Sequence, residues 1–300
     1  MRKLLYLAAC VCLASAAAWR GRAATAPAPN PDDGSVTQGI FTNTYFNLSY
    51  PLLPGWTVGI AGPQPSISGY YVLANFVPTG EFRGTIMVAA QDIFFAAKPF
   101  DDLMAMTGEF SRSISQVDGM TIDRSPSDLW IAGRTFSRFD FSGVGLFRST
   151  LTAKIRCHFV SFNLTAKSPE LLTALLRSVD NLGPASDKDA GRIDPRCISN
   201  YADAEHLLSK VDPAAVAPSF IPIPVRIVVG SNGNVKHVHV IRATSGQRDS
   251  IERALALWKL KPHEIDGRTN EIETGLLIKF TPAGGVIYSP GNGSLPNGRG

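Results

Sequence analysis

The sequence predicts an α+β protein with two domains, an antiparallel-sheet α/β sandwich followed by a small β-β-α-β module. Three observations support this prediction. Residues 39–182 hold many stretches of alternating apolar and polar residues and only two helical stretches. Residues 183–217 combine prolines with mixed charges, as linkers do. Residues 218–281 return to a regular order of strand, strand, helix and strand, before a glycine- and proline-rich tail at 282–300 that we expect to be disordered.

Residues 1–24 have the pattern of a signal peptide for export. A basic start precedes an apolar run that ends in small residues, and we expect cleavage near Ala18 or Ala24. The apolar run is shorter than the roughly 20 residues that cross a membrane, which favours cleavage over an uncleaved anchor. The mature protein is therefore expected in the periplasm or outside the cell, and an uncleaved leader or acylation at Cys10 stays open as a membrane anchor.

The charge balance argues against nucleic acid as a partner. The chain carries 29 Lys and Arg against 25 Asp and Glu, a formal net charge of +4, and this excess lies in the leader. The chain after Ala24 is therefore balanced and has no run of basic residues, which leaves no electrostatic surface for nucleic acid or anionic lipid. Contact with a membrane is expected only through an uncleaved or lipidated N-terminus.

The first domain is predicted to consist mostly of antiparallel strands covered by two helices. One helix is expected between Pro99 and Val117, and the second begins at Pro169 behind the capping residue Ser168. Both carry apolar residues at helical spacing, so both can cover a sheet. The predicted strands are Phe41–Tyr50, Trp56–Ile60, Tyr70–Phe76, Thr85–Asp92, Met120–Asp123, Arg134–Phe141 and an alternating tract from Leu146 to Thr165.

Several short motifs of this domain also occur in a known group of proteins. They are Phe46–Pro51, Pro54-Gly55-Trp56, the Gly133-Arg134 turn and the helix start at Ser168–Leu171. In these motifs and in the order of its elements, the domain resembles PsbP-like domains over residues 39–182. The resemblance implies an accessory or binding module rather than an enzyme.

One short helix is expected within the linker, from Tyr201 to Lys210. The cysteines Cys157 and Cys197 remain once the leader is removed. In an oxidising compartment they either form one disulfide or stay as two unpaired thiols. The outcome depends on a distance that the fold sets.

The second domain begins with a hairpin. Val225, Ile227 and Val229 alternate with other residues in the first strand, and residues 230–234 allow a tight turn into a second strand. A helix is expected to begin at an N-cap, Asp249, and to end at Trp258. An extended segment at Leu260–Pro262, a turn at Asp266-Gly267 and a last strand over Ile272–Phe280 complete the module.

Turn, helix and strand-end residues of this module recur in a known family. They are Gly233, Ser245-Gly246, Ala254-Leu255, Trp258, Lys261-Pro262, Asp266-Gly267 and Phe280. At these positions the module resembles the C-terminal domain of the TonB family, periplasmic proteins that contact outer-membrane receptors. The resemblance implies a protein-interaction module that is accessory to TonB-type transport. TonB proteins that span the periplasm carry a long proline-rich rod, whereas a globular domain takes that place here, so we do not expect a full energy transducer.

The last predicted strand is the candidate binding site for a partner. An exposed strand edge can pair with an extended peptide, which here would come from another envelope protein or from a receptor. The same edge can instead pair with a second copy of the chain and give a homodimer. The candidate partner-binding residues are Glu271, Glu273, Gly275, Leu277 and Lys279.

Few residues point to chemistry, and we expect neither enzymatic activity nor a cofactor. Cys157 and His158 are neighbours on a predicted strand, where adjacent side chains point to opposite faces, so they cannot form a catalytic pair. The alternative is an envelope metal-binding protein or enzyme that uses the first domain or a histidine site. His237 and His239 share one face of a strand, and His263 is the candidate third ligand.

Overall fold

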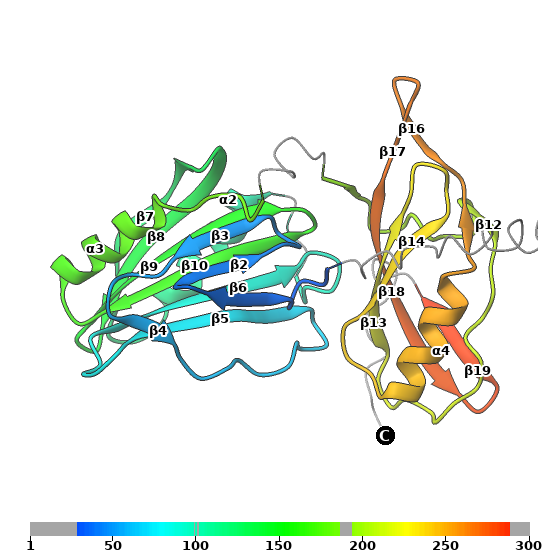
Figure 1. Ribbon diagram of the computed structural model, residues 1–300, viewed down its shortest axis with the longest axis horizontal. Coiled ribbons are helices and arrows are strands. Elements are labelled where there is room, and N and C mark those ends of the chain that lie inside the picture. The colour runs from blue at the N-terminus through cyan, green and yellow to red at the C-terminus, as the bar shows by residue number, and fades with distance from the viewer. Residues whose placement is uncertain (1–28, 99, 101, 187–193, 289–300) are drawn as a thin grey trace, which may run out of the picture.

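The computed structural model describes residues 29–98, 100, 102–186 and 194–288. The predicted leader and most of the predicted tail lie outside these ranges. Within them the fold is α+β, with three helices and mostly antiparallel sheets in two domains that lie side by side (Figure 1). Among the described residues, no helix combines the length and the apolar character that crossing a membrane requires.

The first domain is built on a seven-stranded sheet with the strand order β4-β5-β6-β10-β9-β8-β7, and a three-stranded sheet, β1-β2-β3, packs against it. Two predicted strand regions are hairpins, because Asn47 and Arg156 take positive φ values of 48° and 51° at the reversals. The strands are β1 (Gly34–Thr37), β2 (Ile40–Asn43), β3 (Leu48–Pro51), β4 (Trp56–Val58), β5 (Tyr70–Pro78), β6 (Gly84–Asp92), β7 (Met120–Ile131), β8 (Arg134–Gly143), β9 (Leu146–Ile155) and β10 (His158–Ala166).

Two helices cover opposite faces of this sheet. Helix α3 (Pro169–Val179) begins at the predicted cap, where Ser168 Oγ accepts a hydrogen bond from the N–H of Leu171. Helix α3 and the three-stranded sheet cover the same face of the seven-stranded sheet, and between them lies a core of aromatic and branched side chains. Helix α2 (Leu103–Ser115) is capped by Asp102 and packs on β7, β8 and β9 from the other side.

The second domain has a five-stranded sheet in the order β11-β18-β13-β14, with β19 also paired to β18. Helix α4 (Ser245–Leu255) covers one face and buries Ile251 and Leu255 against the sheet. A separate hairpin, β16 with β17, projects from the domain (Figure 1). The strands are β11 (Arg196–Cys197), β12 (Leu207–Ser209), β13 (Ile223–Val229), β14 (Val235–Val240), β15 (Lys259–Leu260), β16 (His263–Ile265), β17 (Arg268–Asn270), β18 (Ile272–Thr281) and β19 (Gly284–Tyr288).

Helix α4 begins before the predicted N-cap, Asp249. Thr244 is the N-cap, and Gln247 accepts a hydrogen bond from the Thr244 N–H, at 3.2 Å, to complete a capping box. Asp249 therefore lies inside the helix. The Thr-x-x-Gln pattern was the stronger start signal, because it satisfies N–H groups at both positions.

Most of the predicted linker belongs to the second domain. The helix expected from Tyr201 to Lys210 is absent from the described residues, and β12 lies there instead. Tyr201 is buried in the second core and donates a hydrogen bond to the Lys261 carbonyl oxygen at 2.7 Å. The predicted disorder of the tail is also wrong for Gly284–Tyr288, which forms β19.

Candidate functional site

The strand predicted to offer a free edge, β18, is an inner strand of its sheet. One edge pairs with β13 along Ile272–Ile278. The other edge pairs with β11 at its start and with β19 at its end. The expected pairing of this strand with a partner peptide or with a second copy is therefore corrected, because β13 occupies one edge and β11 and β19 occupy the two ends of the other.

The candidate partner-binding side chains contact the chain's own residues. Glu273 is fully buried at the junction between the domains. A Cβ atom on Gly275 would lie 2.7 Å from Cβ of Phe94 in the first domain. Leu277 packs against the first domain's core. Of the remaining two, Glu271 forms an ion pair with Lys236, and Lys279 is half-buried in register with Val286 of β19.

A buried cluster of charged side chains joins the two domains. Arg226 of β13 lies at its centre, 3 % exposed, and donates from Nη1 to Oδ2 of Asp92 at 2.7 Å and from Nη2 to Oε2 of Glu273. Nη1 also lies 2.7 Å from Nε2 of His158, which accepts a hydrogen bond. Asp92 and His158 belong to the first domain, whereas Arg226 and Glu273 belong to the second. One guanidinium therefore links both domains.

A second arginine completes the cluster. Arg156 donates from Nη2 to Oε1 of Glu273, and its guanidinium carbon lies 4.0 Å from the centre of the Tyr45 ring. The Tyr45 hydroxyl donates to the same Glu273 oxygen at 3.4 Å. Two arginines thus face two carboxylates, so the formal charges cancel within the cluster.

Burial sets the protonation of the neighbouring groups. It raises the pKa of Asp92 to about 6, although Arg226 acts in the opposite direction. Burial, together with Arg226, lowers the pKa of His158 well below its ordinary value, so this ring is neutral and can accept from the guanidinium. The same two causes lower the pKa of His239 to about 3. Burial disfavours the charge of Arg226, but Asp92, Tyr45 and Glu273 together outweigh burial and raise the pKa.

The cluster fixes how the domains sit more than it adds to stability. Removing charges from water costs about as much free energy as their attraction returns, whereas loss of one partner leaves an unpaired buried charge. Any rotation of the second domain would break several of these bonds at once. Sequence analysis missed Arg226 and Asp92; the available signal was an arginine inside the apolar strand Ile223–Val229.

The structure joins Cys157 and Cys197 as a disulfide with an Sγ–Sγ distance of 2.17 Å and a Cα–Cα distance of 5.5 Å. Cys157 lies in the core of the first domain, next to β10. Cys197 lies in β11, on the edge of the second domain's sheet. The bond therefore crosses the junction beside the charged cluster.

The three candidate metal ligands do not come together. His239 Nε2 hydrogen-bonds the Tyr71 hydroxyl at 3.3 Å, and His237 Nε2 lies 3.1 Å from Oδ1 of Asn30. His263 packs edge-on against the Tyr201 ring instead. The described part of the chain contains no group of three or more His, Cys, Asp or Glu side chains arranged to hold a metal ion.

Strand β14 ends the second domain's sheet on one side, and no strand of the described residues pairs with its outer edge. The Ile241 N–H bonds the Pro224 carbonyl, so alternate residues pair with β13 and the N–H and C=O groups of Val238 and Val240 point away from it. Arg248 Nη1 donates to the Val240 carbonyl at 2.8 Å. Neither backbone group of Val238 has a partner among the described residues.

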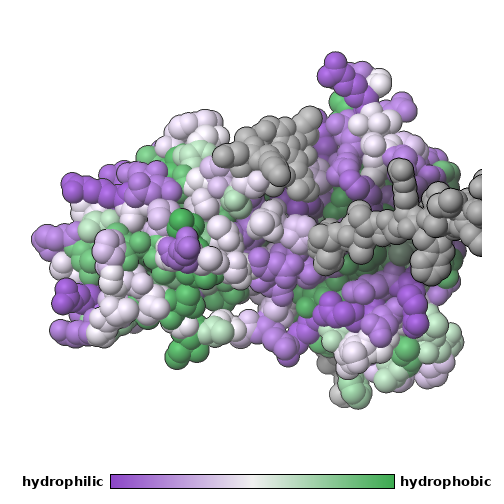
Figure 2. Space-filling model, viewed as in Figure 1, coloured by the Kyte–Doolittle hydropathy of each residue, from purple (hydrophilic) through white to green (hydrophobic). Residues whose placement is uncertain are grey.

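The first domain also has an apolar groove of about 360 Å³ beside β5. Exposed Val58 and Ile60 line it together with Tyr71 and Val72. Apolar side chains gather on this face of the domain, around β5 and the segment after β4 (Figure 2). Of the described residues that line the groove, Asp32 alone carries a charge.

Two solved structures illustrate what this chain is similar to. Cyanobacterial PsbP from a Synechocystis species matches with a TM-score of 0.35 and 13% identity, over 50% of this chain and 96% of that chain. LpqN of Mycobacterium tuberculosis, described as involved in cell envelope biogenesis, matches with a TM-score of 0.32 and 15% identity, over 52% of this chain and 88% of that chain. No protein family and no curated protein sequence matches the chain. A PsbP structure is thus among the solved structures that resemble this chain. The identity and the TM-score are too low to support an argument about function.

Proposed function

We propose that this chain is an exported, non-enzymatic protein of the cell envelope that binds another envelope protein through the free edge of β14. Its role is accessory to TonB-type transport, without energy transduction by the chain itself. The observation that carries the binding proposal is that the N–H and C=O of Val238 face outward at the end of the sheet and have no partner in the described ranges. Such groups are what an extended segment of a partner needs in order to add a strand.

Two features support export. The leader has the basic, apolar and small-residue order of a signal peptide. The Cys157–Cys197 bond belongs to proteins of oxidising compartments, such as the periplasm. Both features are independent of the resemblance to TonB.

Two further features support an accessory role. The module has the strand, strand, helix, strand order on which the TonB resemblance rests. It is also tied to its neighbour by the disulfide and the charged cluster, so it presents β14 from a fixed position. A transducer needs a long reach, whereas this module stands directly on a globular domain.

Site-specific photo-crosslinking in cells tests the proposal. A benzoylphenylalanine at Lys236, whose side chain is 55% exposed in β14, is expected to capture one envelope protein. The same probe at Val144, which is 82% exposed in the first domain, is the control and should not capture it. Equal adducts at both positions, or none at Lys236, would contradict the proposal. An adduct with a second copy would identify a homodimer instead.

A proline variant tests the backbone pairing itself. Val238→Pro removes only an outward-facing N–H, which a sheet edge tolerates. We expect the adduct at Lys236 to fall about tenfold, since each lost hydrogen bond weakens binding by about 0.5–1.5 kcal/mol. Val238→Thr keeps the N–H and the branched shape, so it should behave like the native chain. Equal losses in both variants would count against strand addition.

A further inference from the structure

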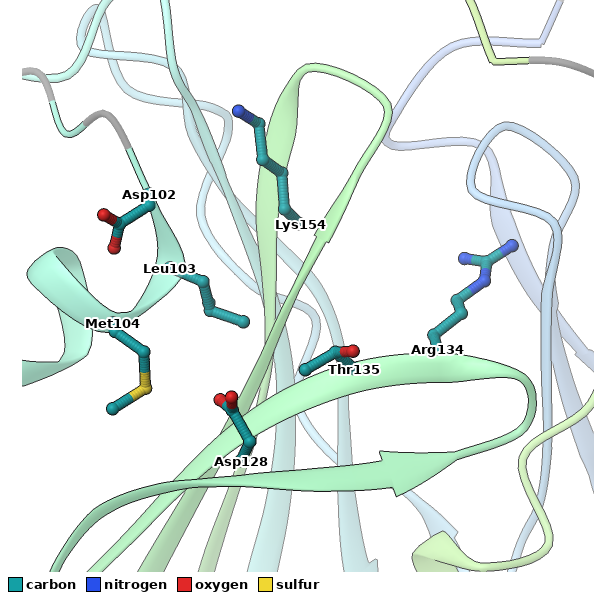
Figure 3. Close-up of a pocket in the computed structure, with 7 residues that line it drawn as sticks. All are labelled: Asp102, Leu103, Met104, Asp128, Arg134, Thr135 and Lys154. Carbon is teal, nitrogen blue, oxygen red and sulfur yellow. The ribbon is translucent and has the colours of Figure 1, made fainter.

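A surface of the first domain has the features of a ligand site. It is a pocket of about 450 Å³ between the start of α2 and the strands β7, β8 and β9. In Figure 3, Asp102, Leu103 and Met104 come from the helix side, and Lys154 and Asp128 lie on opposite sides of the opening. Arg134 and Thr135 complete the lining.

The charges of the pocket balance. Lys154 and Arg134 are positive, and Asp102 and Asp128 are negative. Two of the four have protein partners: Asp102 caps α2 through the Ala105 N–H, and Arg134 donates to the Phe46 carbonyl oxygen at 3.4 Å. The side chains of Lys154 and Asp128 form no hydrogen bond or ion pair with any described residue, nor with each other. One cation and one carboxylate are thus left available for a ligand.

An exposed tryptophan lies beside these groups. Trp130 is 71% exposed, an unusual position for so large an apolar ring. It stands in register with Thr135, which lines the pocket, and two residues after Asp128 on the same strand. Residues two apart on one strand share a face of the sheet, and so do residues that stand opposite each other on neighbouring strands. The Trp130 indole therefore lies on the pocket side. An aromatic face beside a carboxylate favours a bound cation.

We propose that this pocket binds a small zwitterion, with its ammonium group at Asp128 and Trp130 and its carboxylate at Lys154. A short peptide with free ends has this chemistry. A purely anionic or purely cationic ligand would leave one of the two available charges unpaired, whereas a zwitterion matches a lining whose formal charges cancel. The open shape of the pocket and its charged side chains also suit a small charged molecule better than a lipid chain.

Calorimetry on the mature full-length chain tests the proposal, with the dipeptide alanyl-alanine as the probe. We expect millimolar binding that weakens about tenfold or more for N-acetyl-alanyl-alanine and for alanyl-alanine amide, because each lacks one charge. Cellobiose, a neutral disaccharide, should not bind. Equal affinity for the dipeptide and both blocked forms, no binding of the dipeptide, or cellobiose binding that Trp130→Ala abolishes would overturn the proposal.

Variants assign the two ends of the ligand. Asp128→Asn should bind the dipeptide more weakly than the native chain does, and it should bind the dipeptide and its acetylated form equally. Lys154→Met should also bind the dipeptide more weakly, and it should bind the dipeptide and its amide equally. Both side chains are exposed, so both variants should fold, and thermal unfolding checks this. Lys210→Met, in the other domain, is the matched control and should bind like the native chain. If Lys210→Met weakens binding as much as Lys154→Met, the assignment is wrong.

Discussion

The two faces of the C-terminal sheet are both buried, but against different chemistry. One face packs Val225, Ile227 and Leu276 under α4 in an apolar core. The other face presents Arg226 and Glu273 to the first domain. An apolar core tolerates small shifts of its parts, because the hydrophobic effect has no direction. A set of hydrogen-bonded charges has a single good arrangement, so the second face specifies how the domains meet.

The largest expected effect comes from breaking the charged face. Arg226→Met leaves Asp92 without its cation in a fully buried place. We expect a loss of about 3–5 kcal/mol in the free energy of unfolding, measured with urea. Adding Asp92→Asn should restore part of that loss, since Glu273 still has Arg156. Arg112→Met, at a surface ion pair, should cost under about 1 kcal/mol. If Arg226→Met costs no more than Arg112→Met, the cluster does not lock the domains.

The covalent link beside the charged face should have the next largest effect. Cys157→Ala with Cys197→Ala removes a bond that spans 40 residues. The free energy of unfolding should fall by about 2–4 kcal/mol, because the unfolded chain gains freedom. Dithiothreitol should lower the stability of the native chain by a similar amount and leave the double variant unchanged. Sensitivity of the double variant to dithiothreitol would contradict this.

A glycine probes how closely the two domains approach. Gly275→Ala places a Cβ 2.7 Å from Cβ of Phe94, so the junction must shift. We expect a cost of about 1–3 kcal/mol in thermal or urea unfolding. Gly246→Ala is the control: no atom lies within 4 Å of its added Cβ, and within α4 alanine should stabilise by about 0.5–1 kcal/mol. If Gly275→Ala leaves the free energy of unfolding unchanged, the two domains pack less closely than this distance indicates.

Acid should weaken the charged face gradually. The pKa of His239 is about 3 in the folded protein, below its unfolded value near 6.5, so its contribution is present above pH 6.5 and is lost as the pH falls toward 3. His158 acts in the same direction. Asp92 opposes them between about pH 4 and 6, because its folded pKa is raised. Two histidines act against one carboxylate, so the free energy of unfolding should fall as the pH falls. Each of these groups changes that free energy by at most about 1.4 kcal/mol per pH unit.

Urea unfolding at a series of pH values measures this slope. Stability is expected to decrease from pH 6.5 downward, and His239→Gln should flatten the decrease. A slope that is identical in the native chain and in His239→Gln would assign the acid sensitivity to other groups.

The apolar face of the C-terminal sheet could be predicted from sequence, and the charged face could not. Alternation of Val225, Ile227 and Val229 is a signal within one strand. Arg226 and Glu273 instead look like ordinary exposed positions, since a residue that faces solvent and one that faces another domain have the same spacing. Only the strand register and the docking of the domains distinguish them.

The chain ends of the second domain were missed for a related reason. Gly284–Tyr288 is short and glycine-rich, which is typical of a tail, yet it forms a strand because β18 supplies a ready edge. The candidate partner strand failed as a prediction for the same cause: β11 and β19 pair with it. Long periodic segments such as α3 and β10 carried enough local signal to be predicted.

The Cys157–Cys197 bond also determines how the molecule would respond to a mechanical pull. A force applied to the C-terminal domain reaches the first domain through the two sulfur atoms, so the 40-residue segment between them carries no tension. That segment contains β10, which lies in the middle of the seven-stranded sheet, and α3. An oxidised molecule stretched to its full length is therefore shorter by roughly 130–145 Å than a reduced one. A pull on the oxidised molecule therefore acts on the strands before Cys157 and leaves β10 and α3 outside the path of the force.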